Sequence, residues 1–228
     1  MESLPLTHGL FGRLRADTGD DWEDYVDHRF VQAIGDGTLR YEAFRHFLTQ
    51  DYLFLIHFAR AYALAAFKAT RLADIQAAAA TLTSIVGTEM PLHVRYCAEW
   101  GIAPEVMQAT PEALETTAYT RFVIDRGLSG DLLDLYVALA PCLIGYAEAG
   151  DRLLSSPATR REGNPYVPWI DAYAGEGYRD AVRGTIAALD RLGAEGGADA
   201  RYPALLASFR AATRLETAFW EMGWRAGE

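Results

Sequence analysis

The chain has 228 residues, half of them hydrophobic, which is enough to bury the core of one large domain. Its formal net charge of −10 excludes the basic surface that nucleic-acid recognition requires. No stretch reaches the roughly 18 consecutive apolar residues of a membrane-spanning helix, and residues 1–19 lack the charged start and long apolar run of a signal peptide. We therefore expect a soluble, cytoplasmic protein with neither nucleic acid nor membrane as a partner, and with reduced thiols at Cys97 and Cys142.

The first half of the chain has apolar residues at helical rather than alternating spacing. We expect residues 1–19 to form a loosely ordered N-terminal extension and residues 35–39 to form a turn. The run 40–70 contains neither Gly nor Pro and is long enough for about eight helical turns. A bend is predicted around Gly87 and Pro91 in the last helix of this half. The predicted helices are residues 22–34, 40–70 and 72–100.

The second half continues the helical pattern, with connectors predicted at residues 101–111, 155–165 and 193–200. The predicted helices are residues 112–127, residues 130–155, a short helix that ends near Tyr173, residues 176–192 and residues 199–226. The sequence contains no clear β-hairpin, internal repeat or low-complexity linker. We therefore predict an all-α fold in a single domain that spans residues 1–228.

The stretch ALAPCLIGYAEAG, residues 138–150, reads as a buried helix that carries a proline, a thiol and a phenol. Pro141 cannot donate a backbone hydrogen bond, so it tends to kink its helix and release a backbone carbonyl. Cys142 and Tyr146 lie four residues apart and therefore share one helical face. Taken alone, Cys142 is better explained as a buried core position than as a nucleophile, because free cysteine is commonly buried.

Asp51 lies within the apolar run FLTQDYLFLIHF, where helical spacing places it on one face with Phe54 and Phe58. One interpretation is a carboxylate at the helix surface or paired with a neighbouring helix. The other is a carboxylate that lines a pocket with aromatic walls, where burial would tune its proton affinity.

Glu216 lies within ATRLETAFWEMGW, with Phe219 and Trp220 three and four residues later on the same helical face. A buried carboxyl group that stays protonated near neutral pH can serve as a general acid. A position at the boundary between the core and the solvent is the alternative interpretation.

Four further polar positions are weaker candidates. Tyr119 and Tyr173 are consistent with core packing, in which the ring is buried and the hydroxyl finds an acceptor. Glu89 and His93 form an E-x-x-x-H pair one helical turn apart, a spacing that can place two ligands on one metal ion. A single such pair is a weak metal signal, because carboxylate-bridged iron sites use additional carboxylates and histidines.

Several motifs together resemble the TenA/thiaminase II family, in the same order and over roughly residues 20–226. They are FVQAIGDGTLRYEAFRHFLTQDYLFLIHFARAYA, EMPLH, AYT, LAPCLIGY, WIDAYAGEGY and LETAFWEMGW. The combination is more specific than any one motif. The resemblance implies a haem-oxygenase-like helical bundle, a homotetramer, and no metal or organic cofactor. It also implies hydrolysis of a small-molecule aminopyrimidine in thiamin salvage.

The resemblance also implies roles for individual residues. Cys142 matches the family's nucleophile, which places the chain among the cysteine-containing members, and Glu216 matches the acid/base carboxylate. Asp51 matches the carboxylate that holds the amino edge of the pyrimidine. The substrate-binding positions implied by the resemblance are Asp51, Phe54, Tyr119, Tyr146 and Tyr173.

One position departs from the pattern, because Phe54 stands where some family members carry a tyrosine. The substitution keeps a stacking surface and removes a hydroxyl. The expected reaction converts aminomethylpyrimidine to hydroxymethylpyrimidine, with thiamin as a second possible substrate. Two alternatives stay open at this stage: a metal-dependent oxidase that uses Glu89 and His93, and a non-catalytic pyrimidine-binding regulator.

Overall fold

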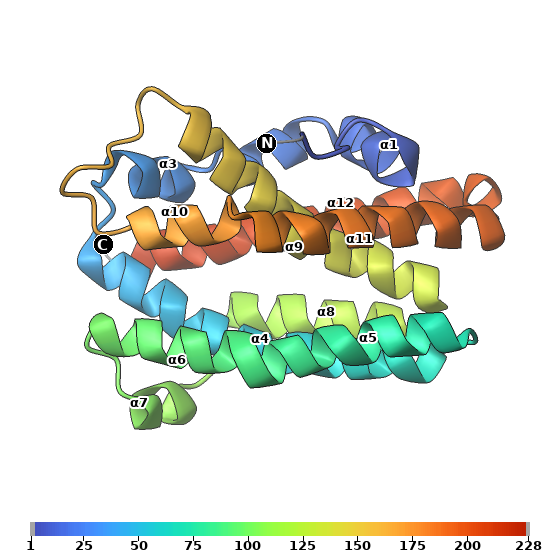
Figure 1. Cartoon of the computed structure of the whole chain (residues 1–228), viewed down its shortest axis with the longest axis horizontal. Helices are drawn as coiled ribbons and strands as arrows, with labels where there is room; N and C mark the ends of the chain where they lie inside the picture. Colours follow the sequence, from blue (N-terminus) through green and yellow to red (C-terminus); the bar gives the residue numbers. More distant parts are fainter. Residues whose placement is uncertain (1–2, 227–228) are drawn as a thin grey trace. The chain divides into compact units, whose positions relative to one another are not determined.

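The computed structural model describes residues 3–226, and this range contains helices and no β-strand (Figure 1). The all-α prediction is therefore confirmed. The elements are α1 (Gly9–Thr18), α2 (Asp20–Val26), α3 (Arg29–Asp36), α4 (Tyr41–Lys68), α5 (Leu72–Ser84), the π-helical segment η1 (Ile85–Glu89), α6 (Met90–Glu99), α7 (Pro104–Ala109), α8 (Leu114–Ser129), α9 (Leu132–Ser155), α10 (Val167–Tyr173), α11 (Glu176–Glu195) and α12 (Ala198–Ala226).

The chain divides into two compact units, each assembled from segments that are distant in sequence. The first unit consists of Met1–Leu39 and Tyr136–Trp220, and the second of Arg40–Leu135 and Glu221–Glu228. The helices α9 and α12 each contribute residues to both units. The single domain expected from chain length stays a prediction, and the two units are described separately below.

In the first unit, α1 packs against α11 and α2, and α10 packs against α3 and α11. The side chains of Phe11 and Leu14 are completely buried, and the backbone N–H of Leu10 donates to Asp190 over 2.7 Å. Gly9 has φ of +67°, and a Cβ at this position would lie 2.1 Å from the Asp190 carboxylate. The expected loosely ordered extension at residues 1–19 is thus corrected: Gly9–Thr18 forms a helix, because Phe11 and Leu14 reach the core.

The predicted helix at residues 22–34 is also corrected, because it is interrupted between Val26 and Arg29. His28 has extended ψ, and its Nδ1 accepts a hydrogen bond from the backbone N–H of Phe30 over 3.2 Å. The imidazole therefore caps α3 in the way that a serine or aspartate side chain usually caps a helix.

In the second unit, α4 packs along α5, α8 and α6, and Figure 1 shows these helices side by side. The predicted helix at residues 40–70 is confirmed as α4. The predicted helix at residues 72–100 is confirmed as a continuous series of α5, η1 and α6, with the π-helical turns near Gly87 and Pro91. The connector predicted at residues 101–111 contains the short helix α7.

The helix α9 is long and apolar enough, by composition alone, to cross a membrane. Of its most apolar 18-residue window, 78% is buried inside the protein. This burial is typical of the core helix of a soluble protein.

Candidate active site

Tyr25 of α2 forms a hydrogen bond with the turn of α9 that carries Cys142. The α-helix runs without interruption through Pro141, whose carbonyl accepts a hydrogen bond from the Tyr25 hydroxyl over 3.0 Å. Gly145 makes this approach possible, because a Cβ there would lie 2.1 Å from the Tyr25 ring. Cys142 is partly exposed and Cys97 is fully buried, and both are thiols rather than a disulfide. Sequence reasoning found Pro141 and missed Tyr25 and Gly145.

Four rings from α9, α10 and α12 meet in the first unit and form what we call the aromatic cluster: Tyr146, Trp169, Tyr173 and Trp220. The ring centroid of Tyr146 lies 4.9 Å from that of Tyr173 and 4.8 Å from that of Trp220. Trp169 lies 4.6 Å from Tyr173. These separations are those of favourable aromatic pairs. Two of the predicted site residues, Tyr146 and Tyr173, are therefore brought together.

Cys142 and Glu216 flank the aromatic cluster along two different helices. Cys142 precedes Tyr146 by four residues on α9, and Glu216 precedes Trp220 by four residues on α12. One helical turn is about 5.4 Å along the axis, so each group lies about one turn from the contact between Tyr146 and Trp220. Glu216 is buried, as are Phe219 and Trp220, and the buried interpretation of this carboxyl group is therefore the correct one.

The second unit holds the remaining predicted residues around α4. Asp51, Phe54 and Phe58 are all buried, and the rings of Phe54 and Phe58 lie 5.8 Å apart. Tyr119 of α8 packs against Phe54 with its ring centroid at 5.1 Å. Asp51 is thus buried one helical turn from Phe54, and its place in the lining of a pocket stays a prediction.

Asp51 faces His93 of α6, with 3.6 Å between Oδ2 of the carboxyl group and Nδ1 of the imidazole. The other ring nitrogen, Nε2, donates to the carbonyl oxygen of Leu48 over 2.8 Å. Burial raises the pKa of Asp51, and the nearby imidazole opposes this rise. Sequence reasoning paired His93 with Glu89 on its own helix and missed this contact across helices.

A family described as TENA/THI-4/PQQC matches residues 16–226. The chain belongs to this family. An aminopyrimidine aminohydrolase of Halalkalibacterium halodurans is 35% identical over 204 residues, which are 89% of this chain and 90% of that protein. An uncharacterized protein of Haemophilus influenzae is 41% identical over 89% of this chain and 93% of its own length.

Solved structures of TenA proteins have the same fold as this TENA/THI-4/PQQC family chain. A TenA family transcription regulator from Silicibacter sp. TM1040 superposes with a TM-score of 0.89 and 44% identity, covering 96% of this chain and 98% of that one. A TenA homologue from Pyrococcus horikoshii gives a TM-score of 0.86 with 26% identity, over 96% of this chain and all of that one. The predicted membership of the TenA/thiaminase II family is thus confirmed.

No group of three His, Cys, Asp or Glu side chains suited to a metal ion is present within residues 3–226 of this TenA family protein. The Glu89–His93 pair thus gains no third ligand, because the imidazole is directed at Leu48 and Asp51. Desolvation, and after it the Asp51 carboxylate, raises the pKa of Glu89. The metal-dependent oxidase is not favoured, because relatives such as the Halalkalibacterium halodurans protein are named aminopyrimidine aminohydrolases.

A buried carboxylate that sequence reasoning missed lies two residues after Tyr146. Glu148 accepts from Arg15 over 2.6 and 2.9 Å, from the indole of Trp22 over 3.0 Å, and from Arg152 over 2.5 and 3.1 Å. Hydrogen bonds of this kind fix α1, α2 and α9 to one another. The spacing of Glu148 and Arg152, one helical turn apart, was the available sequence signal.

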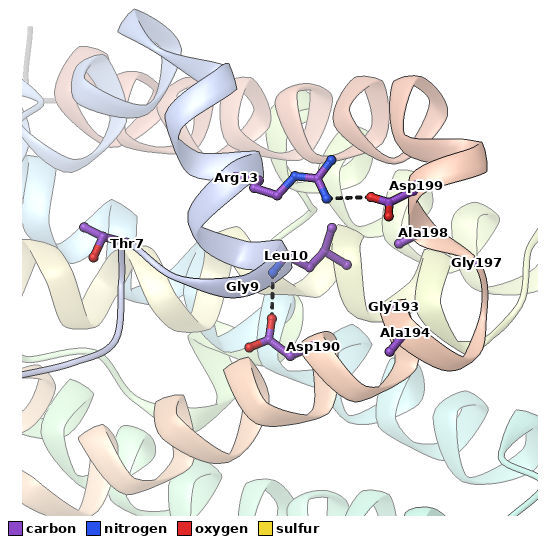
Figure 2. Close-up of a pocket in the computed structure, with 10 residues that line it drawn as sticks. All are labelled: Thr7, Gly9, Leu10, Arg13, Asp190, Gly193, Ala194, Gly197, Ala198 and Asp199. Carbon is purple, nitrogen blue, oxygen red and sulfur yellow. Dashed lines mark hydrogen bonds and ion pairs between the residues drawn. The ribbon is translucent and has the colours of Figure 1, made fainter.

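A surface groove of about 550 Å³ lies in the first unit between α1, α11 and the start of α12 (Figure 2). Arg13 donates to Asp199 over 2.6 Å, and the N–H of Leu10 donates to Asp190, so these polar groups are paired with each other. None of the predicted site residues lines this groove. It supplies no candidate catalytic group of its own.

Proposed function

We propose that this chain is a cytoplasmic aminopyrimidine aminohydrolase of thiamin salvage, which converts aminomethylpyrimidine to hydroxymethylpyrimidine. The single observation that carries the proposal is the aromatic cluster with a partly exposed thiol and a buried carboxyl group one turn away on α9 and α12. A nucleophile and an acid beside a stacking surface are the groups that ring-addition chemistry requires. The name of the Halalkalibacterium relative supports the same assignment.

The first chemical step activates a ring that cannot otherwise lose its substituent at a useful rate. The thiolate of Cys142 adds to the electron-poor ring carbon next to C5, and Glu216 delivers a proton to a ring nitrogen. The thiol must be ionised for this attack. The addition converts an aromatic ring into an electron-rich one, whose electrons expel the substituent from the CH2 group at C5. The amine reacts as its ammonium form and so leaves as neutral ammonia, and the proton that water releases in the second step balances the reaction.

The second step restores the ring. Water adds to the exocyclic methylene that the amine has left, forming the C–O bond and releasing a proton. The ring then expels the thiolate of Cys142, and the ring nitrogen returns its proton to Glu216. The net reaction consumes water and releases ammonia, so both protein groups end in their initial protonation states.

The buried residues of α4 and α8 are assigned to substrate binding. Asp51 accepts a hydrogen bond from the exocyclic amino group, while Phe54 and Tyr119 supply apolar and aromatic contacts. Because Phe54 lacks a hydroxyl, this wall offers stacking without a hydrogen bond at that position. Thiamin fits the same chemistry with a thiazole as the leaving group, and a side-by-side assay decides which substrate is preferred.

The test is ammonia release from aminomethylpyrimidine by the wild type and by Cys142→Ser. We expect the wild type to turn over and Cys142→Ser to fold with a kcat at least about a thousandfold lower, because a serine hydroxyl is a far weaker nucleophile at neutral pH. Cys97→Ala is the matched control for the loss of a thiol. A fall in kcat of less than about tenfold for Cys142→Ser would contradict covalent catalysis by this thiol. Binding of the pyrimidine without turnover in the wild type would favour the non-catalytic regulator.

The proposed assembly is a homotetramer, supported by an apolar surface on α5, η1 and α6. Ala78 is the one buried residue of α5, while Leu72, Ile75, Val86 and Leu92 are exposed. Exposed apolar patches of this kind mark interaction surfaces. The expected occupant is a second copy of the chain, and a mass of one chain by light scattering would contradict this assembly.

A further inference from the structure

We propose that His93 is a positioning residue that is anchored to the helical turn of Asp51 and orients its carboxylate, so that the site accepts an amino group in preference to a carbonyl at the same place on the pyrimidine. This inference rests on the proposed function, since it assigns a task to a residue that contacts Asp51 rather than the substrate. It makes His93 a determinant of substrate specificity.

The hydrogen bond to Leu48 fixes the protonation of the imidazole. A backbone carbonyl can only accept a hydrogen bond, so Nε2, which lies 2.8 Å from the Leu48 oxygen, must carry a hydrogen. Leu48 precedes Asp51 by three residues on α4. His93 is therefore anchored to the same helical turn that carries the carboxylate, and Nδ1 is directed at Oδ2 over 3.6 Å.

The contact between His93 and Asp51 becomes an ion pair only when Nδ1 carries a proton and the carboxylate is charged. A separation of 3.6 Å is longer than a hydrogen bond and short enough for a strong charge interaction in a buried place.

Two further titratable groups lie near Asp51, namely Cys97 of α6 and Glu89 of η1. Burial, and after it the charge of Asp51, raises the pKa of Cys97 to about 12 and also raises the pKa of Glu89. Burial itself raises the pKa of Asp51. Among the described residues, His93 is the group that lowers the pKa of Asp51, so it favours the charged carboxylate against the effect of burial.

The charge state of Asp51 decides what the site recognises. An ionised carboxylate only accepts hydrogen bonds, so it matches the exocyclic N–H of an aminopyrimidine. A protonated carboxyl group also donates, so it tolerates a carbonyl oxygen at that position. With Oδ2 directed at His93, Oδ1 is the acceptor assigned to the substrate. Loss of His93 should therefore weaken binding of the amino compound and reduce discrimination against its oxo analogue.

The sign of the pH effect follows from the same argument. Removing His93 leaves burial unopposed and raises the pKa of Asp51 further, so a higher pH is needed to ionise it. The affinity of the wild type for hydroxymethylpyrimidine should fall toward acid pH. In His93→Gln the same fall should begin at higher pH, and affinity should recover in alkaline solution.

The experiment measures the dissociation constant of hydroxymethylpyrimidine, and of its 4-oxo analogue, by calorimetry from about pH 5 to pH 9. His93→Gln keeps a donor that can reach Leu48 and removes the titratable group. Near pH 7 we expect about tenfold weaker binding and a higher KM, with kcat within about threefold of the wild type. This pattern is expected when a variant loses binding energy equally in the ground state and the transition state. The matched control is His46→Gln, which replaces a partly buried histidine of α4, the helix that carries Asp51. This variant should leave the pH dependence of hydroxymethylpyrimidine affinity unchanged.

A ligand-independent measurement completes the test. Carbon-13 NMR of the Asp51 carboxyl group should titrate at higher pH in His93→Gln than in the wild type, and Asp51→Asn should abolish the acidic fall in affinity in both backgrounds. An unchanged Asp51 titration in a folded His93→Gln would overturn the proposal, as would unchanged affinity and amino-over-oxo selectivity. If the wild type binds no pyrimidine while the titration moves, the proposed function falls and the electrostatic coupling stands.

Discussion

Glu148 and Asp51 are both buried carboxyl groups on long helices, yet their surroundings differ in the number of donors. Burial would raise the pKa of Glu148, but the hydrogen bonds and charges of Arg15 and Arg152 lower it overall. Among the described residues, His93 is the ion-pair partner of Asp51, and burial raises the pKa of Asp51. Glu148 has its acceptor capacity filled by the protein, whereas Asp51 keeps acceptor capacity for another molecule. The number of donors, rather than burial, separates a structural carboxylate from a candidate binding group.

Glu216 is a third buried carboxyl group, and its replacement tests whether it is a structural group like Glu148 or a functional one. Glu216→Gln keeps the shape and cannot transfer a proton, so we expect kcat to fall by about 10²–10⁴ while hydroxymethylpyrimidine binding stays within about tenfold. The decline of the wild-type rate at high pH should vanish in this variant. Near-wild-type kcat with a lowered thermal midpoint would place Glu216 with Glu148 as a structural group.

Glu148→Gln should mainly affect stability. The change removes the charge that Arg15 and Arg152 share, and we expect the free energy of unfolding to fall by about 2–3 kcal/mol with kcat per folded molecule unchanged. Because the pKa of Glu148 is lowered on folding, its stabilisation is present above the pKa of an unfolded glutamate, about 4.3, and is lost as pH falls through the folded value. In denaturant titrations, the difference in the free energy of unfolding between Glu148→Gln and the wild type should therefore become smaller at acid pH. Equal stability at neutral pH would contradict the assignment.

Asp51→Asn should have the smallest effect of the three variants. In contrast to Glu148→Gln, it should weaken ligand binding and leave stability intact. Since Asp51 has a single charged partner, replacing it should leave the thermal midpoint unchanged or slightly raised. The amide loses the charge and adds an unwanted donor, so the affinity for hydroxymethylpyrimidine should fall by about tenfold. A large loss of stability with unchanged KM would end the distinction between the two carboxylates.

The fold was largely predictable because long runs with a 3.6-residue period dominate the sequence, as in α4, where no Gly or Pro interrupts the pattern. The break between α2 and α3 was not predictable, because histidine is an unusual helix cap and His28 acts here through its ring nitrogen. The helix α1 was missed because it is short and contains Gly9 and Gly12.

The candidate site was predictable wherever its members share one helix. The face of Asp51, Phe54 and Phe58 follows from spacing within α4. Contacts between helices gave no such signal: nothing in the spacing of residues 146, 173 and 220 indicates that their rings meet, and the same is true of Asp51 and His93. These contacts depend on tertiary packing, for which a single sequence carries little information.

The pair of indoles in the aromatic cluster gives the protein a built-in optical signal. The rings of Trp169 and Trp220 lie 6.1 Å apart and cross at 71°, a fixed chiral arrangement of two strong near-ultraviolet chromophores. Near-ultraviolet circular dichroism responds to such fixed packing, while far-ultraviolet circular dichroism responds to the helices themselves. A change of the near-ultraviolet band at constant helicity that is present in the wild type and absent from Trp169→Phe would therefore report rearrangement of α10 against α12, without any label attached to the chain.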